Sequence, residues 1–237
     1  MPRRARLVIP GLPFHVTQRG VNRCAIFVDD EDRRTFLRLL RRRAAEQQLA
    51  VHAYVLMDNH VHLLATPGHA GSLSGALRRC GQVYVQYFNG RWNRSGALWQ
   101  GRFASSPVQS DRHLLLVQRY IDLNPVRAGM VRFPEEHAWS SVHCLAGRRP
   151  DPLVTPHEIY LSLGNSTATR VAAYAGLLAE GLEDETVRAI RRSMTQQRAF
   201  GTEQFGSMME RTLGLPARCR GPGRPRVSSR MDSDRQG

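Results

Sequence analysis

Lysine is absent from this chain, so all 34 of its basic residues are arginine. Only 20 residues are acidic, which leaves a formal net charge of +14 at pH 7. The coding bias of a GC-rich genome can explain arginine in place of lysine, but it does not explain the excess of basic residues. Because arginine binds phosphate through paired hydrogen bonds and stacks on bases, the composition indicates a polyanionic partner.

Cysteine is scarce and is not spaced for metal binding or crosslinking. The four cysteines, at positions 24, 80, 144 and 219, contain no C-x-x-C pair, which indicates neither a zinc site nor a disulfide framework. No apolar run approaches the ~18 to 20 residues that a membrane span needs. We therefore expect a cytoplasmic protein with reduced thiols, in contact with the chromosome.

The hydrophobic patterns of the first 124 residues predict the order strand, helix, strand, strand, helix, strand, helix. Strands are expected at 14–20, 50–57, 60–66 and 105–109, and helices at about 29–48, 72–88 and 111–124. This order is the ferredoxin-like split pattern, an antiparallel sheet backed by helices. The predicted fold class is therefore α+β.

Composition also predicts how the chain is divided. Residues 1–147 are expected to form one domain, followed by a proline-rich linker at 148–156. Helical segments near 167–180, 184–198 and 202–213 are too small and alanine-rich for a large core of their own, so 157–215 is expected to be a helical appendage. Residues 216–237, rich in Pro, Gly, Arg and Ser, are predicted to be a disordered basic tail.

Two histidines share one face of the strand expected at 60–66. Side chains alternate across a strand, so His60 and His62 project side by side. Val61 and Leu63 point to the opposite face, where they can pack against helices. The paired imidazoles have the geometry of a metal site. The same pattern also fits two ordinary half-exposed histidines, so a second half-site is needed to favour a metal.

That second half-site is predicted on the helix at 111–124. Tyr120 and Asn124 are four residues apart and therefore lie on one face of the helix. A phenol and an amide oxygen beside two imidazoles can form a metal-assisted nucleophilic site. Tyr84 and Tyr87 are rival nucleophiles, but they lie on the apolar stripe of another predicted helix, so we expect them in the core.

Arginine alternates with aromatic side chains in the glycine-rich loop at 89–103. Aromatic faces stack on unpaired bases while arginines contact phosphates, which makes Trp99, Gln100 and Arg102 candidates for nucleic-acid binding. A loop that its tryptophan fixes without any ligand is the alternative interpretation.

The chain resembles the REP-associated tyrosine transposases, members of the HUH superfamily of single-strand DNA nucleases, whose motif is His-hydrophobic-His. The resemblance lies in three stretches, Tyr54-Val-Leu-Met-Asp-Asn-His-Val-His-Leu-Leu64, Leu98-Trp-Gln-Gly-Arg-Phe103 and Arg119-Tyr-Ile-Asp-Leu-Asn-Pro-Val-Arg-Ala-Gly-Met-Val131. Their order and spacing make the combination more specific than any one of them.

The resemblance implies a transposase that cuts and rejoins single-stranded DNA in a metal-dependent reaction. Tyr120 is then the nucleophile, which forms a 5′-phosphotyrosine and releases a 3′-hydroxyl. His60, His62 and Asn124 are the implied ligands of a divalent cation, Mg²⁺ or Mn²⁺. Two imidazoles suit manganese at least as well as magnesium. The implied substrate is a DNA hairpin of REP type with a single-stranded flank.

The resemblance also implies which residues hold the DNA. The first strand and its exit contribute Arg19, Asn22 and Arg23, and Arg127 belongs to the motif around Tyr120. A solvated basic turn is the other interpretation of the first three. The REP-associated branch is associated with monomers, so a monomer is favoured over a dimer.

One position departs from the pattern. Relatives commonly carry glutamine where Asn124 stands, and a residue before proline is disfavoured in helical geometry, so direct and indirect ligation by Asn124 both stay open. No general base for Tyr120 can be named. A nucleic-acid-binding regulator with a ferredoxin-like fold and no catalytic activity is the alternative function.

Overall fold

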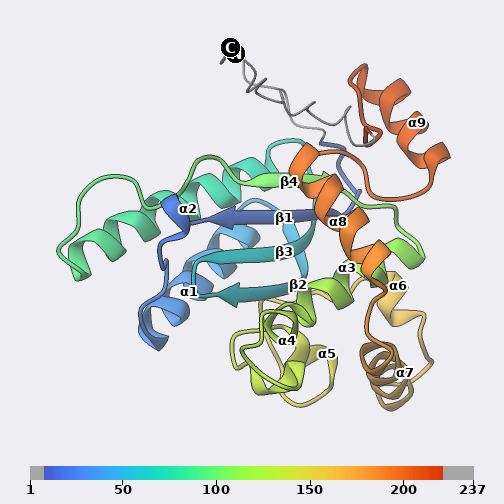
Figure 1. The fold of residues 1–237 in the computed structure, drawn as a ribbon, viewed down its shortest axis with the longest axis horizontal. Coiled ribbons are helices and arrows are strands. Elements are labelled where there is room, and N and C mark those ends of the chain that lie inside the picture. The colour runs from blue at the N-terminus through green and yellow to red at the C-terminus, as the bar shows by residue number, and fades with distance from the viewer. Residues whose placement is uncertain (1–7, 221–237) are drawn as a thin grey trace, which may run out of the picture.

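The computed structural model describes residues 8–220 and is built on a four-stranded antiparallel sheet (Figure 1). The strands are β1 (Phe14–Arg19), β2 (Leu49–Met57), β3 (His60–Pro67) and β4 (Ala104–Pro107), in the spatial order β2-β3-β1-β4. The helices that connect or follow them are α1 (Asp30–Glu46), α2 (Ser72–Arg91) and α3 (Arg112–Asp122). The predicted element order and the ferredoxin-like α+β fold are confirmed.

Helices α1 and α2 cover one side of the sheet, which we call the first face; they lie behind it in Figure 1. Alternation along β3 sends Val61 and Leu63 into this layer, as the sequence predicts. They join Phe36 of α1 and Tyr84 of α2 in a core whose members are almost fully buried. The first face is therefore an ordinary hydrophobic core, and Tyr84 belongs to it.

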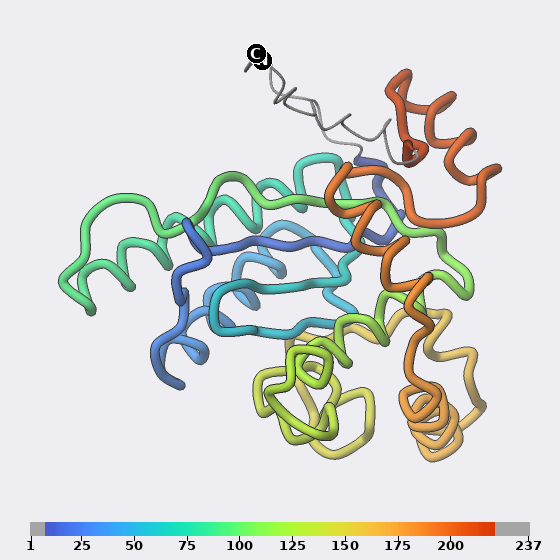
Figure 2. Tube along the Cα trace, viewed as in Figure 1, coloured from blue at the N-terminus to red at the C-terminus, as the bar shows by residue number. Residues whose placement is uncertain are grey.

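The other side, the second face, is covered by α3 and by helices that follow it in the chain. The helices after α3 are α4 (Asn124–Arg127), α5 (Val142–Leu145), α6 (Glu158–Leu161), α7 (Thr167–Ala179), α8 (Asp184–Gln196) and α9 (Glu203–Leu213), of which α9 packs in a separate cluster with Ile9 and Leu12. The short 3₁₀ helices are η1 (Val21–Arg23), which precedes α1, and η2 (Pro134–Glu136). Figure 2 follows the chain from α7 back across the sheet through α8 to the β4 edge.

The segment at 148–156, expected as a linker, lies along the edge strand β2. The amide of Thr155 donates to the carbonyl of Val51 at 2.7 Å, and the hydroxyl of Tyr54 donates to Asp151 at 2.6 Å. Apolar side chains of α6, α7 and α8 then share one cluster with β2, β3 and α3. The C-terminal helices are thus packed on the sheet and position groups at its second face.

Part of the expected tail is ordered against α9. Ala217 is buried, and its carbonyl accepts a hydrogen bond from the amide of Ala199 at 2.8 Å. The rest of the predicted basic tail, residues 221–237, lies outside the described residues. Within residues 8–220, no helix is long and apolar enough to cross a membrane.

Candidate functional site

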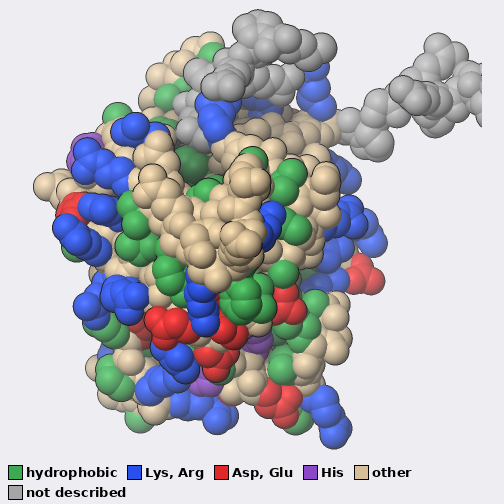
Figure 3. Space-filling model, turned by 90° about the vertical axis from the view of Figure 1, so that its left-hand side faces the viewer, with side chains coloured by type: hydrophobic (Ala, Val, Ile, Leu, Met, Phe, Trp, Pro, Cys, Tyr) green, Lys and Arg blue, Asp and Glu red, His purple; other side chains and the backbone are tan. Residues whose placement is uncertain are grey.

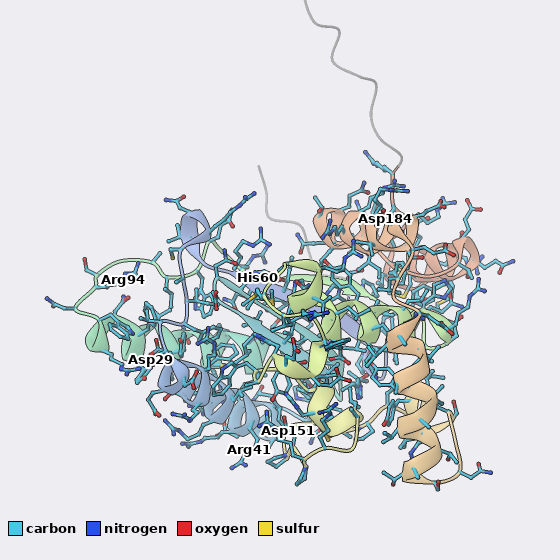
Figure 4. All side chains as sticks on the ribbon, turned by 60° about the horizontal axis from the view of Figure 1, so that its bottom comes forward. Asp29, Arg41, His60, Arg94, Asp151 and Asp184 are labelled. Carbon is cyan, nitrogen blue, oxygen red and sulfur yellow. The ribbon has the colours of Figure 1, made fainter. Side chains whose placement is uncertain are left out.

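The two histidines of β3 stand together on the second face. Their ring centroids are 5.0 Å apart. His62 is buried, whereas His60 is partly open to solvent. Figure 4 labels His60 on the sheet and Asp184 at the start of α8, the two elements between which the site lies.

Each of these imidazoles uses its Nδ1 atom for a hydrogen bond inside the protein. Nδ1 of His60 lies 2.7 Å from Oδ1 of Asn59, and Nδ1 of His62 lies 2.9 Å from Nε2 of His15. The side-chain amide oxygen of Asn59, Oδ1, can only accept a hydrogen bond. Nδ1 of His60 therefore carries the proton, and Nε2 of His60 keeps its lone pair. Such hydrogen bonds to the second nitrogen are what orients histidine ligands in metal sites.

Both rings are held in the neutral form. Burial lowers the pKa of His60 to about 4, with a smaller contribution from the charge of Arg19. Burial also lowers the pKa of His62 well below its ordinary value. At neutral pH each ring is therefore uncharged, as a ligand must be.

Tyr120 approaches this pair from α3. Its ring centroid lies 5.7 Å from that of His62 and 5.6 Å from that of His15, edge to face in both cases. The side chain of Asp111 caps the helix by accepting the amide hydrogen of His113 at 2.8 Å. The predicted strand and helix half-sites thus come together in the fold.

Asn124 lies on the same side despite the proline that follows it. The chain starts a new short helix, α4, at Asn124, and Pro125 stands in its first turn. A proline is tolerated there because a first-turn amide has no partner within the helix. Asn124 consequently reaches the cavity that Tyr120 and the two histidines line.

This cavity, which we call the site cavity, has a volume of about 690 Å³. It is open to solvent, and β1, β3, the loop after α2, α3, α4 and α8 all contribute to its walls. The lining residues are Thr17, Arg19, His60, His62, Gln100, Gly101, Arg102, Ala104, Tyr120, Asn124, Arg191, Met194 and Thr195.

The donor set fits a divalent cation only in part. Among residues 8–220, no three His, Cys, Asp or Glu side chains come together as a metal site. A cation would therefore rely on the two imidazoles, on the Asn124 amide and on oxygen ligands from outside the chain. An open cavity with unused imidazole nitrogens is compatible with that arrangement.

Polar groups on either side of Tyr120 fix its helix. Arg119 is buried and donates to the carbonyl of Gly181, and it lies 3.4 Å from Glu180. Asp122 is fully buried and accepts the hydroxyl of Tyr174 at 2.6 Å. Burial raises the pKa of Asp122 to about 7 although hydroxyl donors oppose the change.

The residues expected to contact nucleic acid separate into two sets. Arg19, Gln100 and Arg102 line the site cavity. Asn22 and Arg23 do not line it and lie at the left-handed turn of η1, with φ values of 52° and 59°. Asn22 and Arg23 are also exposed, so the solvated-turn interpretation stays open for both.

Arg127 and Trp99 are not among the residues that line the site cavity. Arg127 lies 3.5 Å from Asp184 of α8. Trp99 is half-buried, and its indole donates to the carbonyl of Gly81 at 3.3 Å. It lines a neighbouring cavity of about 800 Å³ between α2 and its own loop. Gly101 and Arg102 border both cavities, so the two are adjacent.

The sequence interpretation missed several groups at the site. His15 and Thr17 project from β1 beside the histidine pair, and Arg191 and Thr195 come from α8. Alternation places His15, Thr17 and Arg19 on one strand face, which is a usable signal. Nothing local in the sequence places α8 over the sheet.

Comparison with known proteins agrees with this architecture. Residues 9–124, which include the histidine pair, Tyr120 and Asn124, match the family model for IS200-like transposases. No curated protein matches the chain.

Solved structures similar to this chain include two transposases. One is a REP-associated tyrosine transposase bound to a REP hairpin, at 19% identity and a TM-score of 0.53 over 67% of this chain and 93% of that chain. At this identity the likeness shows the fold alone. The other is a candidate transposase from Deinococcus radiodurans R1, at 24% identity over 51% of this chain and 96% of that chain, with a TM-score of 0.32 that is too low to support an argument.

Proposed function

Because the chain belongs to the IS200-like transposase family, whose model matches residues 9–124, we propose that it cuts and rejoins single-stranded DNA through a covalent tyrosine intermediate. The observation that carries the proposal is the convergence of His60, His62, Tyr120 and Asn124 on one cavity. One chain supplies all four groups, which favours a monomeric enzyme.

The proposed chemistry is one exchange of phosphoesters. The phenol oxygen of Tyr120 forms a bond to phosphorus while the bond from phosphorus to the 3′ oxygen breaks. The proton of the phenol ends on that 3′ oxygen, so the products are a 5′-phosphotyrosine and a free 3′-hydroxyl. No water is consumed, and the reverse reaction with another 3′-hydroxyl rejoins a strand.

The chain's own residues have to hold phosphate and phenol in line. His60, His62 and Asn124 are the residues that would hold a Mg²⁺ or Mn²⁺ ion. When bound, this ion supplies Lewis-acid stabilisation of charge on the scissile phosphate. Arg19 and Arg102 line the same cavity and can bind the flanking phosphates. In the face that Figure 3 shows, arginine side chains lie mainly toward the edges, and acidic side chains gather below the centre.

The proposed substrate is a DNA hairpin with an unpaired flank. A strand must bend to place one phosphate on the site, and extruding a paired base costs a few kcal/mol. The hairpin-bound neighbour supports this substrate class. We expect cleavage in the unpaired flank.

The test is to incubate the protein with an end-labelled hairpin and Mn²⁺ and to look for a slowly migrating protein–DNA adduct. Tyr120→Phe should abolish the adduct while leaving hairpin affinity within about twofold, because only one hydroxyl is removed. Tyr87→Phe is the matched control and should retain the adduct.

Chelation tests the cation separately. Removal of divalent ions should suppress adduct formation in the wild-type protein, and added Mn²⁺ should restore it. A protein that binds the hairpin tightly but never forms an adduct would instead be a non-catalytic regulator.

A further inference from the structure

Helix α8 forms one wall of the site cavity although it lies outside residues 9–124, the part of the chain that matches the family model. Arg191, Met194 and Thr195 line the cavity opposite the sheet. The helix crosses in front of β1 and β4 in Figure 1 and contacts both strands. The C-terminal region therefore takes part in forming the site.

The position of α8 is fixed at both ends. At its start, Asp184 pairs with Arg127, and the preceding Gly181 accepts the hydrogen bond of Arg119. After its end, the carbonyl of Arg198 accepts the hydroxyl of Ser106, and the amide of Phe200 donates to Pro107 of β4 at 2.8 Å.

Buried side chains hold the middle of the helix. Val187 and Ile190 are part of the hydrophobic cluster on the second face, and Met194 is buried as well. Because α8 is held in this way, its cavity-lining residues Arg191, Met194 and Thr195 have a defined orientation.

Arg191 is the charged residue that α8 brings to the cavity. Its side chain is exposed, and among residues 8–220 it forms no ion pair, unlike Arg119 and Arg127. It lies close enough to His62 that its charge adds to the effect of burial in lowering the pKa of that ring. An arginine without a carboxylate partner, facing neutral imidazoles, is free to bind an anion.

We propose that Arg191 binds the scissile phosphate and stabilises the extra negative charge that it acquires in the transition state. This inference rests on the proposed function. A guanidinium can donate two parallel hydrogen bonds to the non-bridging oxygens of a phosphate. Arg191 exchanges no proton or electron in this role; it acts by charge and by its hydrogen bonds.

The role of Arg191 differs from that of Arg19 and Arg102. Those two arginines approach from the first strand and from the loop after α2. Arg191 comes from α8 and lines the same cavity as His62 and Tyr120. The three guanidinium groups together surround the cavity from three elements of the fold.

The test compares Arg191→Gln with Arg192→Gln, its neighbour on α8, which does not line the site cavity. The rate of adduct formation in a single turnover is measured with a labelled hairpin and Mn²⁺. The protein concentration is varied from below to above the value that saturates the hairpin. Arg191→Gln should slow the saturated rate by about 10²-fold, the usual effect of removing one charge-stabilising donor. Arg191→Lys should recover part of that loss, and Arg192→Gln should stay within about twofold of wild type.

A charge-selective readout separates phosphate binding from a structural effect. Hairpin affinity is measured for two proteins that cannot form the adduct. The first is the single variant Tyr120→Phe, and the second is the double variant that carries Tyr120→Phe and Arg191→Gln. With an ordinary phosphodiester at the cleavage position, the second protein should bind about tenfold more weakly. With a neutral methylphosphonate at that position, the two proteins should bind equally.

Three results contradict the proposal in distinguishable ways. If the wild-type protein forms no adduct, the proposed function fails and this inference fails with it. If the wild type reacts and Arg191→Gln reacts at the same rate, only the role of Arg191 is wrong. If Arg191→Gln weakens binding equally for phosphodiester and methylphosphonate, the residue does not contact that phosphate.

Discussion

The two faces of the sheet are built from different kinds of side chain. On the first face, Phe36 and Tyr84 pack edge to face with ring centroids 5.2 Å apart, inside an almost entirely apolar cluster. On the second face the apolar cluster is interrupted by buried polar groups, among them His15, His62 and Asp122.

Two polar atoms close to the site lack a hydrogen-bond partner among residues 8–220. Nδ1 of His15 and Oγ1 of Thr17 are buried without a hydrogen bond among the described residues. Leaving a buried polar atom unpaired destabilises a protein by about 1 to 3 kcal/mol. The comparison teaches that the second face tolerates unfavourable burial directly beside its reactive groups.

His62 and Leu63 are neighbours on β3 that point to opposite faces, so they separate the two roles directly. His62→Ala should reduce adduct formation at least ~10³-fold, since a proposed ligand of the cation is lost. Its effect on stability should be modest, about 1 to 2 kcal/mol, because one hydrogen bond to His15 is removed. Single-turnover kinetics and urea denaturation measure the two effects on the same samples.

Leu63→Ala should show the reverse pattern. Leu63 is fully buried on the first face, and truncating such a leucine costs about 2 to 5 kcal/mol of unfolding free energy. The folded fraction should form the adduct at nearly the wild-type rate. A variant that keeps its stability but loses the reaction would show that the faces are not separate in function.

Asp122 tests how the second face accommodates its buried charge. Asp122→Ala removes the acceptor of Tyr174, Ser140 and Ser141, and it should cost about 2 to 3 kcal/mol of unfolding free energy. Asp122→Asn keeps an acceptor oxygen and should stay within about 1 kcal/mol of wild type. Equal losses in both variants would show that the negative charge itself stabilises the fold.

Substitutions of Arg102 and Arg127 are expected to differ in their effect on hairpin binding, and this difference is the smallest of those predicted. Arg102 is exposed and lines the site cavity, whereas Arg127 pairs with Asp184. Arg102→Gln should weaken hairpin binding by about 1 kcal/mol and lower the slope of log affinity against log salt by about one phosphate contact. Arg127→Gln should have a smaller effect on both quantities. Affinity measured from 50 to 200 mM salt decides between them.

Much of this molecule follows from local rules. Alternation along a strand is enough to place His60 and His62 on one side and Leu63 on the other. The spacing of four between Tyr120 and Asn124 predicts their shared face across the break that Pro125 introduces. The order of strands and helices predicts the sheet topology because few arrangements satisfy it.

The rest depends on tertiary packing that no local pattern contains. His15 reaches His62 only because β1 and β3 pair with Thr17 opposite His62, a register that is settled by the whole sheet. Arg191 and Arg192 look alike on an amphipathic helix, and only the docking of α8 makes one of them line the site cavity. Trp99 has a fixed place against Gly81 that composition alone does not reveal.

The most direct test of the account is to identify the residue that becomes attached to DNA. Trypsin cleaves after arginine, and Arg119 and Arg127 release the peptide Tyr120–Arg127, which contains a single tyrosine. After reaction with a hairpin and Mn²⁺, mass spectrometry should find the nucleotide on this peptide. Attachment to the peptide Cys80–Arg91, which carries Tyr84 and Tyr87, or no attachment at all, would contradict a nuclease site on the second face.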